Sequence, residues 1–169
     1  MTVKKILVPI DYSDDSYQAL QWGGSLAEKY SGEILLLHVI PKAVEEVSTH
    51  AAMWEDVPAY YYEGMDTVRK GFRPEHIIID LAEQAETQLT DLARRELKGA
   101  VPVAVKVAVG KPPEEILRMA REEGADLIVM GTHGRTGLRH LLLGSVAETV
   151  VRTAPCPMFT VRAVAAAVS

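Results

Sequence analysis

The sequence predicts an α/β fold: an open five-stranded parallel sheet with strand order 3-2-1-4-5 and helices on both faces. Short apolar runs alternate strictly with segments of helical periodicity along the 169 residues. Three of the five runs are continuously apolar, as in strands covered on both faces, whereas the other two carry features of sheet edges. Together these observations favour a single domain over residues 1–169.

The first half of the chain begins with an apolar run at residues 6–10, which indicates a buried strand. Ser13 can cap the helix that follows, and the two acidic residues after it suit the positive end of the helix dipole. Apolar residues then recur at helical spacing until Gly32, a typical helix stop. Residues 34–40 form a second, continuously apolar strand.

A long connection within the domain, residues 41–74, leads to the next helix and contains Trp54 and three consecutive tyrosines at 60–62. Connections of this length are uncommon and often functional. This one leaves a carboxyl end of the sheet, so it could lie over a binding crevice. The alternative, which we favour, is a surface loop whose aromatic residues pack on the domain or on a second subunit.

Helical spacing returns near Glu75 and ends at Gly99. In residues 101–109 valines alternate with other residues, which predicts a strand with one covered face and one wetter face, as at a sheet edge. Pro102 is also easiest to place at an edge.

A proline pair and two acids at residues 112–115 open the next helix, which Gly124 ends. Residues 127–130 form another continuously apolar strand. Residues 145–153 read as the last helix and 157–161 as the last strand, where Pro157 again suggests an edge.

Strands one, two and four are therefore central and strands three and five are edges, which gives the order 3-2-1-4-5. The order reverses between strands one and four, and ligands of such sheets bind there, beyond the carboxyl ends of the strands. Asp11 ends the first strand and Gly131 ends the fourth. We expect both to face one crevice.

The glycine-rich segment GTHGRTGLRHLLLGS runs from Gly131 to Ser145, between the fourth strand and the last helix. Glycines allow close approach of the backbone to a ligand, and inward-turned N–H groups form an anion nest. Ser145 begins a helix, where the N–H groups and the dipole attract phosphate. The segment is neither a Walker A loop, which needs a lysine, nor a G-x-G-x-x-G fingerprint.

The spacing G-x-x-G, nine residues, then G-S is the nucleotide-binding signature of the universal stress protein family, which this chain resembles. Other matching segments are ILVPIDYSD at 6–14, LHV at 37–39, ADLIVMG at 125–131 and APCP at 154–157. The resemblance covers nearly the whole chain except the long connection and the last few residues. It implies a Rossmann-like fold of the adenine nucleotide α-hydrolase type, with the sheet order inferred above.

The resemblance also implies an ATP site. Asp11 would lie near the ribose and phosphates and is the candidate ligand of an accompanying Mg²⁺. The backbone of Val39 would hold adenine, and Met130 and Gly131 would border the base and sugar. The remaining implied site residues are Pro9, Ile10, His133, Gly134, Arg135, Gly144, Ser145 and Val146.

The family further implies a homodimer through the last strand, Pro157 to Val161. A net charge of −5 and a pI near 5.5 argue against nucleic acid and anionic membranes as partners. A single cysteine, Cys156, and the lack of a signal-peptide pattern or an apolar span favour the cytoplasm. Cys156 and His38, inside an apolar strand, are interpreted as structural residues.

Three functions remain open. The first is an ATP-binding sensor or regulator in stress response. The second is a slow ATPase or another nucleotide-hydrolysing enzyme, although no catalytic constellation beyond Asp11 and a metal is visible. The third is an interaction scaffold without nucleotide, against which the intact glycine motif argues.

Overall fold

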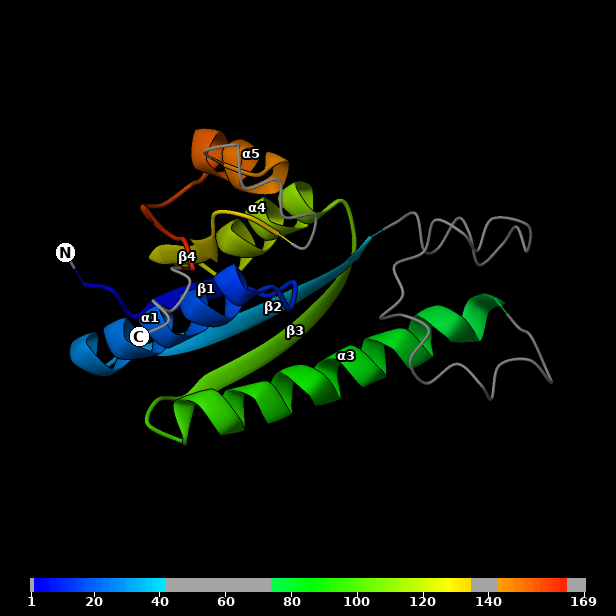
Figure 1. Cartoon of the computed structure of the whole chain (residues 1–169), viewed down its shortest axis with the longest axis horizontal. Coiled ribbons are helices and arrows are strands. Elements are labelled where there is room, and N and C mark those ends of the chain that lie inside the picture. Colours follow the sequence, from blue (N-terminus) through cyan, green and yellow to red (C-terminus); the bar gives the residue numbers. More distant parts are fainter. Residues whose placement is uncertain (1, 42–73, 135–142, 164–169) are drawn as a thin grey trace, which may run out of the picture.

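The structure is a computed structural model that describes residues 2–41, 74–134 and 143–163, and it contains the predicted five-stranded parallel sheet. The strand order is β3-β2-β1-β4-β5 (Figure 1). The strands are β1 (Lys5–Pro9), β2 (Glu33–Pro41), β3 (Val103–Gly110), β4 (Leu127–Gly131) and β5 (Met158–Val161). The described helices are α1 (Asp14–Tyr30), α3 (Pro74–Leu97), α4 (Pro112–Glu122) and α5 (Ser145–Thr153).

Two helices cover each face of the sheet, α1 and α3 on one side and α4 and α5 on the other (Figure 1). Alternate residues of β1 serve the two cores: Ile6 and Val8 pack toward α1 and α3, and Leu7 packs toward α4 and α5. A strand covered on both faces must be apolar at successive positions. The continuous apolar runs therefore predicted the central strands correctly.

The edge strands β3 and β5 both begin one residue after a proline, at Val103 and Met158 rather than at the predicted 101 and 157. A proline has no N–H to give to a ladder, but its carbonyl still accepts. The carbonyl of Pro102 accepts from the N–H of Ile34 at 2.9 Å, and the N–H of Ile128 makes the corresponding bond to Pro157 at 3.1 Å.

The end of α1 corrects another expectation. Ser31, not Gly32, takes the left-handed conformation, with φ 51°, and caps the helix. Gly32 is needed for a different reason, because a Cβ atom there would lie 2.7 Å from the carbonyl oxygen of Lys4. The predicted connection 41–74 is also shorter by its two end residues, which belong to β2 and α3. Its aromatic residues lie outside the described residues.

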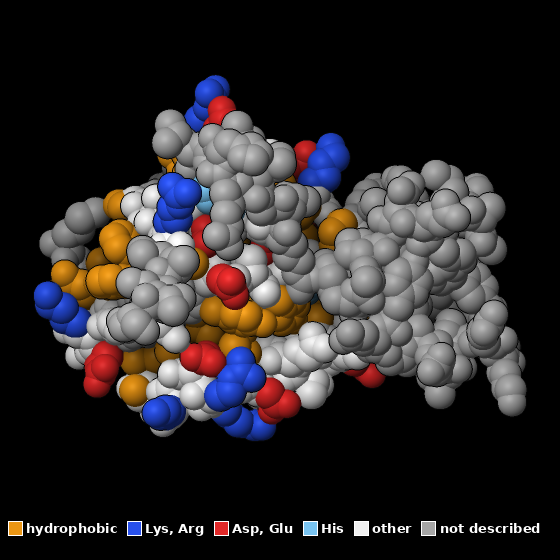
Figure 2. All heavy atoms as spheres, in the orientation of Figure 1, with side chains coloured by type: hydrophobic (Ala, Val, Ile, Leu, Met, Phe, Trp, Pro, Cys, Tyr) orange, Lys and Arg blue, Asp and Glu red, His pale blue; other side chains and the backbone are white. Residues whose placement is uncertain are grey.

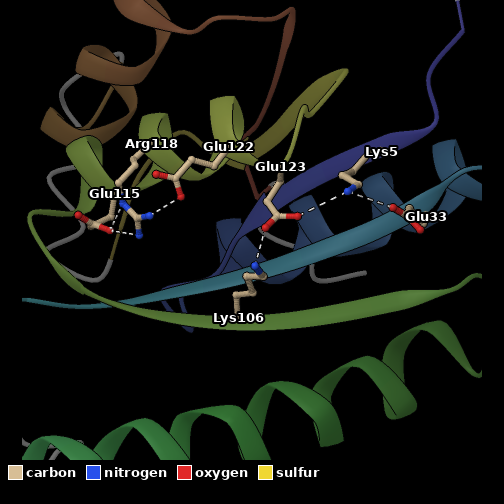
Figure 3. Close-up of polar contacts among 7 residues, drawn as sticks. All are labelled: Lys5, Glu33, Lys106, Glu115, Arg118, Glu122 and Glu123. Carbon is tan, nitrogen blue, oxygen red and sulfur yellow. Dashed lines mark hydrogen bonds and ion pairs between the residues drawn. The ribbon is translucent and has the colours of Figure 1, made fainter.

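Ionic contacts tie the C-terminal end of α4 to the sheet (Figure 3). The carboxylate of Glu123 lies 2.5 Å from Nζ of Lys106 in β3 and 3.5 Å from Nζ of Lys5 in β1. The hydrogen bond from Lys106 holds the pKa of Glu123 below its usual range. Such exposed pairs contribute little to stability.

Acidic and basic side chains are interspersed over the face drawn in Figure 2. No described helix is long and apolar enough to cross a membrane.

Candidate functional site

The carboxylate of Asp11 is fixed at the carboxyl end of β1 by the start of α1. Ser13 caps this helix as predicted, with its Oγ accepting from the N–H of Ser16 at 3.3 Å. The N–H and hydroxyl of Ser13 donate to Oδ1 of Asp11 at 3.1 and 2.5 Å. Tyr12 between them has φ 65°, a left-handed conformation that is uncommon outside glycine. The turn thus orients Asp11 toward the end of β4.

Gly134 lies against the other oxygen of this carboxylate. A Cβ atom at Gly134 would be 2.6 Å from Oδ2 of Asp11, closer than nonbonded atoms approach. The carbonyl oxygen of His133 also lies 3.4 Å from the Ser13 hydroxyl oxygen. The segments after β1 and β4 are therefore in direct contact, at the point where the strand order reverses.

The beginning of α5 completes this group of segments. Gly144 is the N-cap, and its N–H donates to the carbonyl of Thr132 at 2.8 Å. The first helical bond runs from the N–H of Glu148 to Gly144, also at 2.8 Å. The N–H groups of residues 145–147 consequently have no acceptor inside the helix and lie at the positive end of its dipole. This arrangement favours an anion beside Ser145 and Val146.

Asp15, which the sequence suggested only as a dipole-matched acid, also belongs to the site. Its Oδ2 accepts from the Thr132 hydroxyl and the His133 N–H, both at 2.9 Å, and its Oδ1 accepts from the N–H of Ala163 at 2.9 Å. Burial opposes ionisation, but these hydrogen bonds outweigh it and hold the pKa of Asp15 below its usual value. Asp15 is therefore ionised at neutral pH.

This lowered pKa predicts how stability depends on pH. Asp15 binds its proton less readily in the folded than in the unfolded chain, so its stabilisation is complete above the unfolded pKa, about 3.9, and disappears as the pH falls through the folded pKa. We expect Asp15→Asn to lower the free energy of unfolding by about 2 kcal/mol near neutral pH. Urea unfolding of both proteins between pH 7 and 3 should show this difference shrinking below about pH 4. A difference that grows on acidification would contradict the assignment.

The ring of His133 directs its Nδ1 toward Thr132 and Asp15. Its Nδ1 lies 2.9 Å from Oγ1 of Thr132 and 3.6 Å from Oδ2 of Asp15. The Thr132 hydroxyl has one proton, and the carboxylate is the stronger acceptor. The hydroxyl thus donates to Asp15 and accepts from Nδ1–H of His133.

The other residues implied by the resemblance lie around these segments. Pro9, Ile10 and Met130 are buried at the ends of β1 and β4, and Val39 is buried near the end of β2. Arg135 lies outside the described residues. Among the residues that the structure describes, no group of three or more His, Cys, Asp or Glu side chains could hold a metal ion.

The two residues interpreted as structural have matching environments. His38 is only 4% exposed, and its Nδ1 lies 2.7 Å from the carbonyl oxygen of Ile10. Burial, together with the charge of Asp126, raises the pKa of the Cys156 thiol. A raised pKa disfavours the reactive thiolate.

Comparisons with a family model and with individual proteins all match the chain to the same family. The model of the universal stress protein family matches residues 2–162. Universal stress protein MJ0577 of Methanocaldococcus jannaschii is 31% identical over 159 residues, which cover 94% of each chain. Universal stress protein YxiE of Bacillus subtilis is 33% identical over 158 residues, which cover 94% of this chain and 98% of the relative.

Solved structures share the fold. The structure of MJ0577 superposes with a TM-score of 0.75 at 28% identity, covering 98% of this chain and all of that one. A universal stress protein in complex with cAMP gives a TM-score of 0.59 at 20% identity, covering 96% and 98% of the two chains. The Archaeoglobus fulgidus protein in complex with dAMP gives 0.58 at 21% identity, covering 95% and 99%.

Proposed function

The chain belongs to the universal stress protein family, and we propose that it binds ATP between Asp11 and the loop 131–145 and acts as a cytoplasmic, nucleotide-dependent regulator in stress response. The observation that carries this proposal is the contact of Gly134 with Asp11 beside the N-terminus of α5. Two universal stress proteins of the same fold were solved in complex with adenine nucleotides, one with cAMP and one with dAMP. Their bound ligands support an adenine nucleotide here.

The phosphates would lie at the start of α5. The phosphates would accept hydrogen bonds there from the N–H groups of Ser145 and Val146 and from the exposed Ser145 hydroxyl. The N–H of Gly144 is engaged with Thr132, so Gly144 would act by allowing close approach rather than by donating. Asp11 would be the protein ligand of a Mg²⁺ ion bound to the phosphates, since such ions often take one carboxylate.

The base would lie near Val39. The last bond between β1 and β2 runs from the N–H of Ile10 to the carbonyl of Leu37, at 2.8 Å. Backbone groups of a strand alternate between its two neighbours, so Val39 directs its N–H and carbonyl to the same side as Leu37, one step beyond that bond. An adenine ring placed there could pair with the backbone as a further strand would.

Calorimetric titration with ATP and Mg²⁺ tests the site. We expect saturable binding by the wild type and its loss in the double variant Gly144→Val, Ser145→Ala, because a larger side chain at 144 meets the Thr132 carbonyl. Competition by AMP and cAMP would rank the nucleotides, and phosphate release from the same sample would separate a regulator from a slow ATPase. If the folded, nucleotide-free wild type does not bind ATP, the proposal is wrong and the function as an interaction scaffold is favoured.

We also propose a homodimer formed through β5. This strand pairs with β4 on one side, and Phe159 on it is 39% exposed. The ring of Trp22 in α1, 50% exposed, packs edge-to-face on Phe159 with 5.6 Å between ring centroids. An exposed aromatic pair beside an edge strand is typical of an interface.

Sedimentation analysis tests this dimer. The wild type is expected to sediment as a dimer and Phe159→Lys as a monomer at the same concentration, because a lysine at this edge must lose its hydration in the interface. Tyr30→Ala is the control, since Tyr30 is a 44% exposed aromatic residue at the C-terminal end of α1, about two helical turns beyond Trp22. A monomeric wild type, or a dimeric Phe159→Lys variant, would contradict the model of assembly.

A further inference from the structure

Thr132, the first residue after β4, directs its polar groups at three different elements. Its N–H donates to the carbonyl of Val161 at the end of β5, at 2.8 Å. Its carbonyl accepts from the N–H of Gly144 before α5, also at 2.8 Å, and its hydroxyl donates to Asp15 in α1 at 2.9 Å. Thr132 is buried. The first turn of the loop is therefore fastened to β5, α5 and α1 at once.

Asp15 closes this arrangement, because its two oxygens serve different parts of the chain. Oδ2 takes the two donors of the loop, Thr132 and His133, whereas Oδ1 takes the N–H of Ala163, two residues beyond β5. The side chain of Asp15 is only 13% exposed. A Cβ atom at Gly131 would lie 2.7 Å from Cβ of Asp15, so α1 abuts the end of β4 directly.

A general role in the helix dipole does not account for these contacts. Asp14 lies in the same first turn and carries the same charge, yet its side chain is exposed. The dipole would make the two acids equivalent. Among the described residues, it is the carboxylate of Asp15 that accepts the hydrogen bonds from Thr132, His133 and Ala163.

We propose that Asp15 is a positioning residue of the nucleotide loop, which holds the first turn of that loop and the chain leaving β5 in one arrangement. This inference rests on the ATP site proposed above. A nucleotide bound beside Thr132 and His133 holds these residues, and through them Asp15, more firmly, so the Ala163 N–H is also held more firmly. By reciprocity, contacts made at the end of β5 alter the affinity for ATP.

The full-length variants Asp15→Asn and Asp14→Asn provide a matched test. Asparagine keeps the size of aspartate but has one acceptor oxygen, so it can hold either the loop or Ala163 and not both. We expect Asp15→Asn to raise the Kd for ATP with Mg²⁺ about 10-fold and Asp14→Asn to change it less than about 2-fold. Circular dichroism of each variant would check that it is folded.

Amide exchange followed by NMR provides the readout that a merely structural role would not move. Saturating ATP should slow exchange of the Ala163 amide about 10-fold in the wild type and in Asp14→Asn, and leave it unchanged in Asp15→Asn. Thr132→Val removes only the hydroxyl that holds Asp15. In ATP-free protein this variant should speed exchange at Ala163 by about 5-fold.

The outcomes separate the two proposals. If the wild type does not bind ATP, the proposed function is wrong, and Thr132→Val alone then decides whether loop and Ala163 are linked through Asp15. If ATP binds but leaves Ala163 exchange unchanged in the wild type, or binds Asp15→Asn as tightly as Asp14→Asn, the positioning role is overturned and the ATP site stands. Thr132→Val also serves if Asp15→Asn does not fold.

Discussion

Replacing Gly131 with alanine is expected to lower the free energy of unfolding by about 3 kcal/mol. The new Cβ atom would lie 2.7 Å from Cβ of Asp15, 3.0 Å from its carbonyl carbon and 3.1 Å from the backbone nitrogen of Ser16. Backbone atoms cannot move aside as a side-chain end can, so either α1 or β4 must shift. β4 is an inner strand and α1 packs against the sheet in the same hydrophobic core, where such shifts are costly.

Urea unfolding at neutral pH measures this effect, and Gly24→Ala in α1 is the matched control. A Cβ atom at Gly24 meets the Cδ2 methyl of Leu97, the end of a side chain that can rotate. Alanine also favours a helix over glycine by about 1 kcal/mol. We expect a loss below about 1 kcal/mol for Gly24→Ala. Equal losses in the two variants would show that the backbone contact at Gly131 is not the cause.

Replacing Gly134 with alanine should weaken ATP binding about 30-fold, or about 2 kcal/mol, and change the free energy of unfolding by less than about 1 kcal/mol. The added methyl group would displace Oδ2 of Asp11, 2.6 Å away, and rotate the carboxylate away from Ser13. The group that must move is the Asp11 side chain at the crevice and not a packed backbone segment, so the nucleotide site is affected more than the fold. Calorimetry with ATP and Mg²⁺ gives the affinity.

A double-mutant cycle with Asp11→Ala tests this explanation. Asp11→Ala removes the carboxylate and should itself weaken ATP binding. In the Asp11→Ala background no carboxylate oxygen remains for the new methyl group to displace. Gly134→Ala should then weaken ATP binding by less than about 3-fold. A full 30-fold loss in both backgrounds would mean that Gly134 acts independently of Asp11.

The sheet order could be predicted because burial on both faces forces a continuous apolar run, a signal that no surface strand needs. The runs in β1, β2 and β4 and the alternating valines of β3 separate central strands from an edge. Element ends were less predictable because any residue can end an element when a neighbouring backbone group takes its hydrogen bond. Ser31 at the end of α1 shows this, with a cap N–H bonded to the carbonyls of Ala27 and Glu28.

The loop and the start of α5 were also visible in the sequence, since close approach requires glycine. The role of Asp15 was not. Two of its three donors, at His133 and Ala163, are backbone N–H groups, which every residue except proline has. A contact with Ala163 also spans almost the whole chain, so no local pattern could indicate it. His133, expected beside the nucleotide, places its Nδ1 3.6 Å from Oδ2 of Asp15, another contact between residues far apart in the sequence.

The position of β1 has a consequence for synthesis of the protein. β1 leaves the ribosome before the other four strands of the sheet, yet it lies between β2 and β4, and Ile6 pairs with Leu127. One edge of β1 can pair early with β2, but the other stays open until β4 has been translated. Open apolar edges recruit strands of other chains. The nascent chain therefore exposes this edge of β1 while residues 42–126 are being made, and pairing with β4 then covers it.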